Sequence, residues 1–174
     1  MSFFRPLTRP LTVAIVTLGL WGCSSLPSSP PFSLLAQSPP QSQQLPITAQ
    51  LTVGNTVIEL ETARTPEEQA IGLMNRTELA ENRGMIFPFS PPRVARFWMK
   101  NTLIPLDMIF VYQGEIKAIA MDVPPCRRDP CPVYGPMTEV DHVIELAAGQ
   151  AKALNLQPGD RLEVTFLKTA TPMP

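Results

Sequence analysis

The sequence contains little that would identify a metalloenzyme, a phosphate-binding enzyme or a nucleic-acid-binding protein. One histidine and three cysteines leave room for at most one zinc site built from these side chains. The sequence has neither a glycine-rich phosphate loop nor the glycine-flanked serine of a hydrolase nucleophile elbow. Lysine and arginine number 14 against 15 aspartate and glutamate residues, and the formal charge of −1 excludes a strongly basic nucleic-acid binder. The sequence is therefore more informative about location and fold than about activity.

Charged residues are missing from a long N-terminal stretch, between Arg9 and Glu59. Arg5 and Arg9 are followed by an apolar run over residues 11–21, which is shorter than the roughly 20 residues that span a bilayer. A short positive segment followed by an apolar run of this length is typical of a secretory signal. We therefore expect residues 1–22 to be a signal peptide and the rest of the chain to be exported.

The end of this segment, Leu20-Trp21-Gly22-Cys23, resembles the lipobox of bacterial lipoproteins. The resemblance implies cleavage before Cys23 and attachment of diacylglycerol to its sulfur, which would anchor the protein in a membrane of the cell envelope. The alternatives are an ordinary secretory signal followed by a chance cysteine, and an uncleaved membrane anchor. All three interpretations place the folded domain outside the cytoplasm, on the periplasmic or extracellular side.

Residues 23–46 are rich in serine, proline and glutamine and contain no charged side chain. Such a segment buries too little apolar surface to offset the entropy lost on ordering, and its composition favours a partly extended spacer. We interpret it as a tether between the lipid anchor and one globular domain over residues 47–168. A short tail over residues 169–174 follows the domain.

The first part of the domain carries clear signals for a turn and for the start of a helix. Residues 51–53 and 57–60 flank Gly54-Asn55 and predict a β-hairpin. In Thr65-Pro66-Glu67-Glu68, a capping threonine is followed by proline at the first helical position and by glutamate three residues after the cap. This capping box predicts a helix that ends near residue 74.

Beyond Gly84 the sequence is dominated by short segments rich in β-branched and aromatic residues. The predicted strands cover residues 85–87, 96–99, 108–112, 115–121, 143–146 and 161–166. Many short strands with one clear helix predict a mainly β, β-rich α+β fold. We expect a compact antiparallel barrel-like or sandwich-like domain with one or two short helices.

The segment from Phe97 to Asp107 is the most distinctive in the chain. If residues 102–106 form the loop of a hairpin, Asn101 faces Asp107 and Lys100 lies beside them. Charged groups in so apolar a segment must be paired or solvated. Three interpretations remain open: a structural ion pair or loop-capping carboxylate, the polar floor of a small pocket, and a Lys/Asp acid–base pair for catalysis.

Cys126 and Cys131 lie five positions apart in a predicted loop. In an exported protein this spacing favours a structural disulfide, which would pin the loop locally. The alternatives are a redox-active pair and a metal-binding pair. Thioredoxin-type pairs have two intervening residues, and this pair has four.

Methionine and histidine give weaker indications of metal binding. Eight methionines permit coordination of a soft metal, but methionine in apolar segments is ordinary core filler. The methionines in such segments are Met74, Met85, Met99, Met108 and Met121. His142 and Glu145 are spaced like part of a metal site but lack a third ligand, and we expect Glu145 to face solvent or to pair with a basic group.

Together these segments resemble the domain of unknown function 192 family of small, often exported bacterial and archaeal proteins. The resemblance covers roughly residues 50–168 and rests on several short motifs. These are Gly72-Leu73-Met74 with Arg76, Gly84-Met85-Ile86-Phe87, residues 97–107, Pro125-Cys126, Tyr134, and Glu145-Leu146 with Gly149. The resemblance implies a compact β-rich fold whose motif residues cluster in space, with no assigned activity and no established cofactor.

These observations predict a membrane-tethered, extracytoplasmic binding or envelope-associated module without catalytic activity. The alternatives are an enzyme acting on a small polar substrate through Lys100 and Asp107, and a periplasmic copper-handling protein that uses methionines and the cysteine pair. An apolar wall with a few converging polar groups suits a small-molecule ligand. The candidate ligand-binding residues are Arg76, Trp98, Lys100, Asn101, Asp107 and Tyr134. We expect no metal, cofactor or nucleic acid to be bound, and a monomeric domain.

Overall fold

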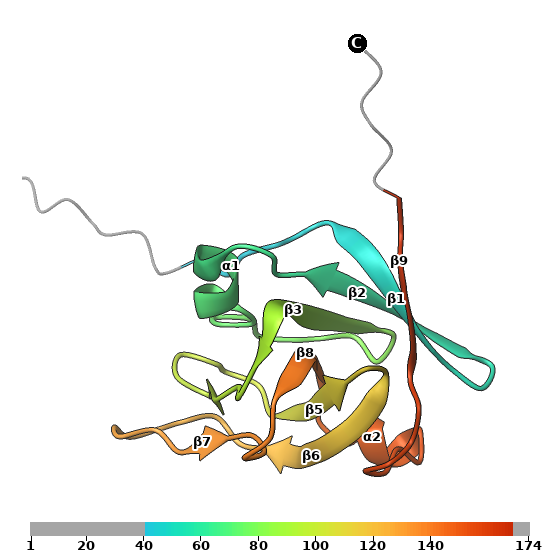
Figure 1. Cartoon of the computed structure of the whole chain (residues 1–174). Coiled ribbons are helices and arrows are strands. Elements are labelled where there is room, and N and C mark those ends of the chain that lie inside the picture. The colour runs from blue at the N-terminus through green and yellow to red at the C-terminus, as the bar shows by residue number, and fades with distance from the viewer. Residues whose placement is uncertain (1–40, 169–174) are drawn as a thin grey trace, which may run out of the picture. The chain divides into compact units, whose positions relative to one another are not determined.

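The computed structural model describes residues 41–168, which form a curved β structure with two short helices (Figure 1). The strands are β1 (Ile47–Val53), β2 (Thr56–Thr62), β3 (Arg83–Arg93), β4 (Phe97–Trp98), β5 (Leu106–Tyr112), β6 (Glu115–Val123), β7 (Val133–Tyr134), β8 (Val140–Ala147) and β9 (Glu163–Phe166). The helices are α1 (Pro66–Ile71) and α2 (Gln150–Ala153). The predicted signal peptide, Cys23, most of the tether and the tail lie outside the described residues. Between residues 41 and 168, no helix is long and apolar enough to cross a membrane.

Seven strands form one sheet in the order β6-β5-β8-β3-β2-β1-β9, and β4 and β7 form a separate two-stranded ribbon. Neighbouring strands are antiparallel except β2 and β3, which run parallel. A parallel pair needs a crossover connection, and α1 lies in that connection. The predicted β-rich α+β fold with two short helices is confirmed. Over the described range the sheet is sandwich-like and does not close, so the barrel-like alternative is wrong.

The local signals in the first part of the domain are also confirmed. Val53 pairs with Thr56 across the predicted hairpin turn. At the start of α1, the Thr65 hydroxyl accepts a hydrogen bond from the Glu68 backbone N–H at 3.1 Å, and the Glu68 carboxylate accepts one from the Thr65 N–H at 3.0 Å. The helix ends at Ile71, earlier than predicted, because Gly72 adopts a φ of +49° and turns the chain away.

The main sheet separates two apolar clusters. Side chains at successive positions of a strand point to opposite faces, so each buried strand contributes to both clusters. The first cluster includes Phe87, Met108 and Phe110, and the second includes Ile109 and Ile144. On β8, odd-numbered positions near the middle therefore face the first cluster and even-numbered positions face the second.

The segment from Phe97 to Asp107 does not form the predicted hairpin. β4 pairs with β7, which places Phe97 opposite Tyr134. β5 already has β6 on one side and β8 on the other, so it has no free edge for β4. Asn101 lies in the turn after β4 with a φ of +56° and does not pair with Asp107.

Candidate functional site

Glu145 occupies an unusual place, in the middle of β8 on the face of the first apolar cluster. It pairs with Met85 of β3 on one side and with Met108 of β5 on the other. Its side chain is only 5% exposed. The expectation that Glu145 faces solvent is therefore wrong, because the alternation along β8 turns its side chain into the core.

No hydrogen bond from residues 41–168 reaches the Glu145 carboxyl group, but its oxygens are not among the fully enclosed polar atoms without a partner, so they keep some exposure in the space beside them. Burial raises its pKa to about 8, and the positive charge of Arg76 only partly opposes this effect. Burial favours the neutral form of a carboxyl group, so Glu145 is mostly protonated at neutral pH and can donate a hydrogen bond. A carboxyl group with a raised pKa at the wall of a recess is a candidate for a role in binding or catalysis.

The Glu145 side chain reaches a narrow recess with a volume of about 40 Å³. This space accommodates a few water molecules or the tip of a larger ligand. The recess lies between the C-terminal end of α1 and the first apolar cluster. Its lining residues are Gln69, Ala70, Ile71, Gly72, Leu73, Met74, Phe87, Phe97, Trp98, Thr102 and Glu145. We call this space the Glu145 recess.

The geometry of the recess depends on close contact between two segments. A Cβ atom on Gly72 would lie 3.3 Å from the ring of Phe87, so glycine lets the end of α1 approach β3. Phe87 in turn packs edge-on against Phe97, with ring centroids 5.0 Å apart. The recess is thus bounded by rigidly packed aromatic rings on one side and by main chain on the other.

Several of the motifs that carry the family resemblance meet at this recess. Gly72-Leu73-Met74, Phe87, Phe97-Trp98, Thr102 and Glu145 all line it. These segments come from five separate parts of the chain, and the fold brings them together. This convergence is what the resemblance implied, and it identifies Glu145 as a member of the candidate site.

Arg76 lies behind the recess in a buried ion pair with Glu61 of β2. Its Nη1 and Nη2 atoms donate to the two carboxylate oxygens at 2.8 and 2.6 Å. Burial alone would raise the pKa of Glu61. The hydrogen bonds from Arg76 and from the Leu45 N–H, together with the charges of Arg76 and Arg83, have a larger effect in the opposite direction, so the pKa of Glu61 lies below the usual value. Arg76 therefore has a structural partner, and it also lines a cavity of about 520 Å³ that does not include Glu145.

The tether also contacts this region. The Gln43 side chain donates to the backbone oxygens of Glu68 and Gly72 at 2.8 Å, and the Gln43 carbonyl accepts a hydrogen bond from Arg76 at 2.9 Å. The last residues of the predicted tether are thus held against α1 and the Glu61–Arg76 pair.

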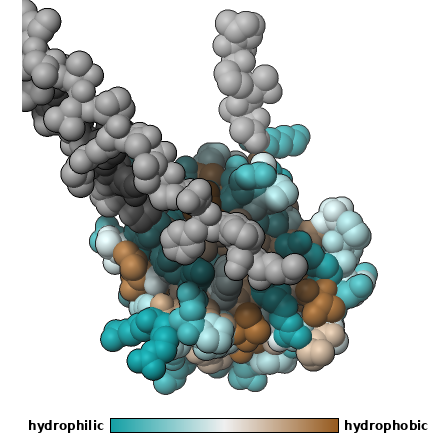
Figure 2. Space-filling view, turned by 90° about the vertical axis from the view of Figure 1, so that its left-hand side faces the viewer, coloured by the Kyte–Doolittle hydropathy of each residue, from teal (hydrophilic) through white to brown (hydrophobic). Residues whose placement is uncertain are grey.

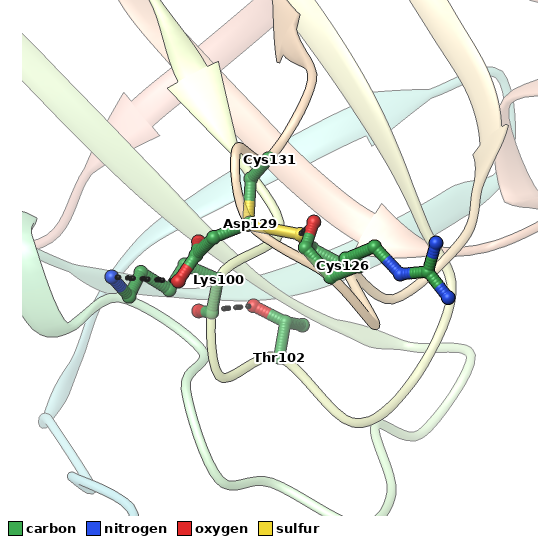
Figure 3. Close-up of a disulfide and its surroundings, with 6 residues drawn as sticks. Lys100, Thr102, Cys126, Asp129 and Cys131 are labelled. Carbon is green, nitrogen blue, oxygen red and sulfur yellow. Dashed lines mark hydrogen bonds and ion pairs between the residues drawn. A yellow bond between two sulfur atoms is a disulfide. The ribbon is translucent and has the colours of Figure 1, made fainter.

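The predicted disulfide between Cys126 and Cys131 is present in the structure (Figure 3). The loop that it closes is tied to the turn after β4 at two points. The Cys126 N–H donates to the Met99 carbonyl at 3.2 Å, and Asp129 forms an ion pair with Lys100 at 3.7 Å. The disulfide loop therefore supports the turn that carries Thr102 into the recess.

Asp107 has a structural role on the face of the sheet opposite to Glu145, because it is paired with Leu146 whereas Met108 is paired with Glu145. It is fully buried, and its two carboxylate oxygens accept hydrogen bonds from the backbone N–H groups of Asp122 at 2.7 Å and of Ala151 at 2.8 Å. It thereby ties β6 and α2 to β5. One of the three interpretations predicted a carboxylate that caps the 102–106 loop. Asp107 instead accepts hydrogen bonds from β6 and α2, which are distant from it in sequence.

The predicted ligand-binding residues do not form one cluster. Arg76, Lys100 and Asp107 each have a different partner, and the hypothesis of a pocket shared by these three charges stays a prediction. Trp98, half-exposed, lines the recess, and Tyr134 lies opposite Phe97 in the neighbouring strand. Glu145 is not among the predicted ligand-binding residues. Its position between Ile144 and Leu146 in a strongly apolar strand is the sequence feature that indicates a buried carboxyl group.

The residues considered for metal binding are arranged as follows. Met85, Met99 and Met108 are core residues, as expected, whereas Met121 is 45% exposed. His142 and Glu145 point to opposite faces of β8, so they do not share a metal site. Cys126, Asp129 and Cys131 form the cluster of metal-binding residue types found between residues 41 and 168, and its cysteines are joined in the disulfide.

Comparison with known proteins gives a family and a fold. The model of the DUF192 family, described as "Uncharacterized ACR", matches residues 49–164. No curated protein matches the chain. A protein of unknown function from Novosphingobium aromaticivorans DSM 12444 has a similar structure, with a TM-score of 0.59 and 40% sequence identity over 67% of this chain and 83% of that one. A protein from Sinorhizobium meliloti 1021, described as a "putative transcription regulator", has a TM-score of 0.60 and 35% identity over 67% of this chain and 91% of that one. The protein therefore belongs to the DUF192 family, whose function is unknown.

Proposed function

We propose that the protein is an exported, lipid-anchored module that binds a small molecule at the Glu145 recess. The observation that carries the binding proposal is the Glu145 carboxyl group itself. It is buried, it has no hydrogen-bond partner in the described part of the chain, and it lines an accessible recess. A ligand that accepts or donates a hydrogen bond at this carboxyl group gives it a partner that residues 41–168 do not supply.

The recess admits only the tip of a ligand, because its volume is about 40 Å³. Neutral Glu145 offers a hydrogen-bond donor and an acceptor, and the Thr102 hydroxyl is a second polar group in the lining. A hydroxyl, amide or amino group suits this pair, while Phe87, Phe97 and Trp98 suit an adjoining apolar part. This arrangement of an apolar wall with few polar groups is usual for small-molecule sites.

The location is proposed from the N-terminal sequence. The signal-like segment 1–22 and the lipobox-like Leu20-Trp21-Gly22-Cys23 support export and lipid attachment, and residues 23–46 supply the tether. A tethered binding module on the envelope surface is consistent with these features. The description of the Sinorhizobium relative suggests a role in transcription, but an exported chain with a formal charge of −1 gives that role no support.

A thermal-shift screen of the full-length protein in detergent tests the binding proposal. The screen uses metabolites, glycans and metal ions against the wild type, Glu145→Gln and the control Glu163→Gln. Glu163 is an exposed carboxylate on β9. We expect at least one compound that stabilises the wild type and the control but stabilises Glu145→Gln much less. If every stabilising compound acts equally on all three proteins, the Glu145 recess is not the binding site.

A further inference from the structure

A second cavity adjoins the Glu145 recess and continues it along α1. Its volume is about 410 Å³, and it shares Gln69, Ala70, Phe97 and Trp98 with the recess. Phe89, Arg93 and Arg96 complete its outer part, together with Pro66. We call this cavity the arginine cleft. Figure 2 views the side of the domain on which α1 lies, where hydrophobic residues are exposed between hydrophilic ones.

Arg93 is held in the cleft by neutral groups. Its guanidinium carbon lies 4.1 Å from the centroid of the Phe89 ring, and its Nη2 donates to the Gln69 Oε1 at 3.2 Å. The orientation of the Gln69 amide is itself fixed, because its nitrogen donates to the backbone oxygens of Ala63 and Pro88 at 3.2 and 2.9 Å. Stacking on a ring and bonding to an amide position the guanidinium but leave its charge uncompensated.

Arg96 is held in the same way from the other side. Its Nη1 donates to the Gly135 carbonyl at 2.9 Å, and its Nη2 contacts the sulfur of Met137. Gly135 is required here, because its φ is +139° and a Cβ atom would lie 2.4 Å from the Ala95 carbonyl oxygen. The segment that follows β7 is therefore fitted closely against the backbone next to Arg96.

Neither arginine is neutralised within the described part of the chain. Among residues 41–168, no carboxylate oxygen lies within 4.0 Å of the guanidinium nitrogens of Arg93 or Arg96. Arg76, Arg83, Lys100 and Lys117 have carboxylate partners, and the other lysines and arginines of this range have none. Arg93 and Arg96 differ from these others because both line the arginine cleft. Two oriented cations without counter-ions, beside an exposed indole ring, are complementary to an anion attached to an apolar group.

We propose that the arginine cleft binds the carboxylate or phosphate group of a small molecule that also carries an aromatic or similar apolar part. The anion lies between Arg93 and Arg96, and the apolar part lies against Phe97 and Trp98 and leads toward the Glu145 recess. The inference rests on the proposed function, since it names the chemical class of the ligand for that site.

Trp98 provides a direct optical measurement of binding. The chain has two tryptophans, and Trp21 lies in the predicted signal peptide, so Trp98 is the only source of indole fluorescence in a mature protein that begins at Cys23. Four probes separate the contributions: benzoate and phenyl phosphate combine a ring with an anion, benzyl alcohol has the ring alone, and inorganic phosphate has the anion alone. Each is titrated into the mature, lipid-anchored protein in detergent.

We expect benzoate or phenyl phosphate to change Trp98 fluorescence saturably, with an affinity at least tenfold higher than that of benzyl alcohol or inorganic phosphate. The comparison of the two anions shows whether the site prefers a carboxylate or a phosphate. Binding should weaken as salt concentration rises. If neither aromatic anion binds better than benzyl alcohol, the proposal is wrong.

Arginine variants of the same mature protein locate the anion. Arg93→Gln and Arg96→Gln should each weaken binding of the preferred anion by about tenfold, because each removes a charge-assisted contact. The control Lys152→Gln, an exposed cation on α2, should leave binding unchanged. Unfolding curves establish that all variants are folded. Equal binding by all three variants would overturn the anion site.

The same variants distinguish failure of this inference from failure of the proposed function. Compounds from the thermal-shift screen that require Glu145 but are insensitive to Arg93→Gln and Arg96→Gln contradict the anion site alone. Compounds that require none of these residues contradict both proposals.

Discussion

Two guanidinium nitrogens of Arg76 donate hydrogen bonds to the Glu61 carboxylate at 2.8 and 2.6 Å, and both side chains are almost completely buried. The pair links β2 to the segment that follows α1. A buried ion pair contributes to stability only while both partners remain, because a single remaining charge is left without compensation.

Removal of one partner of this pair is therefore expected to be costly. Arg76→Met should lower the free energy of unfolding at pH 7 by about 3–5 kcal/mol, measured by chemical denaturation. The double variant Arg76→Met/Glu61→Leu should recover part of the loss, because it removes the buried carboxylate as well and leaves only the partly exposed Arg83 without its partner. A double variant that loses the sum of the two single effects would show that the pair is not energetically coupled.

Asp107 provides a test of structural against functional roles. Asp107→Ala leaves the buried N–H groups of Asp122 and Ala151 without acceptors, and we expect a loss of about 3 kcal/mol in unfolding free energy. Asp107→Asn retains one acceptor oxygen and should lose less. Ligand affinity of the folded protein should stay unchanged in both variants. A variant that has the unfolding free energy of the wild type but a lower ligand affinity would show that Asp107 belongs to the binding site.

The disulfide is expected to stabilise one loop and not the whole domain. Cys126 and Cys131 are five residues apart, and closing so small a ring contributes only about 2 kcal/mol by chain entropy. Reduction should speed hydrogen exchange of the Cys126 N–H, which donates to Met99, while exchange in β5 and β8 stays slow. Global unfolding on reduction would contradict this local role. Alkylation of the purified protein without reductant should find both thiols blocked.

Lipid attachment is tested at Cys23. Cys23→Ser should move the protein from the membrane fraction to the soluble periplasm or the medium, because the predicted acceptor of diacylglycerol is removed. Intact-mass analysis of the wild type should give a chain that begins at Cys23 and carries the lipid. A wild-type protein that is already soluble and begins at another residue would rule out the lipoprotein proposal.

The features that sequence reasoning predicted well are local in the chain. The hairpin around Gly54-Asn55 and the capping box from Thr65 to Glu68 are specified by residues that lie within a few positions of one another. The Cys126–Cys131 disulfide is local in the same sense. The β-rich fold class followed from composition and spacing alone, without knowledge of strand order.

The features that were missed depend on contacts between distant segments. The 97–107 segment has the pattern of a hairpin, but β4 pairs with β7 because both edges of β5 are occupied. Asp107 binds the N–H of Ala151, which is 44 positions away. Glu145 enters the core because β8 lies between β3 and β5, and neither neighbour is adjacent to it in sequence. The pairing of β4, the partners of Asp107 and the burial of Glu145 all depend on the order of the strands in the sheet. The hydrophobic pattern of the sequence does not predict that order.

The central claim is that Glu145 is a buried, unpartnered carboxyl group kept for a ligand, and the pH dependence of stability tests it most directly. The folded-state pKa of about 8 lies above the ordinary value, so the folded state binds more protons than the unfolded state between about pH 4.5 and 8. The contribution of Glu145 to stability is fully present below pH 4.5 and is lost as the pH rises toward 8.

The measurement is the free energy of unfolding of the wild type and of Glu145→Gln from pH 5 to 9 without ligand. The difference between the two proteins removes the effects of Glu61 and His142, which titrate in both. We predict that the wild type loses about 1.4 kcal/mol per pH unit relative to Glu145→Gln between roughly pH 5.5 and 7.5, and that the variant is the more stable protein at pH 9. A constant difference across this range would show that Glu145 titrates as an ordinary carboxyl group and would contradict the account.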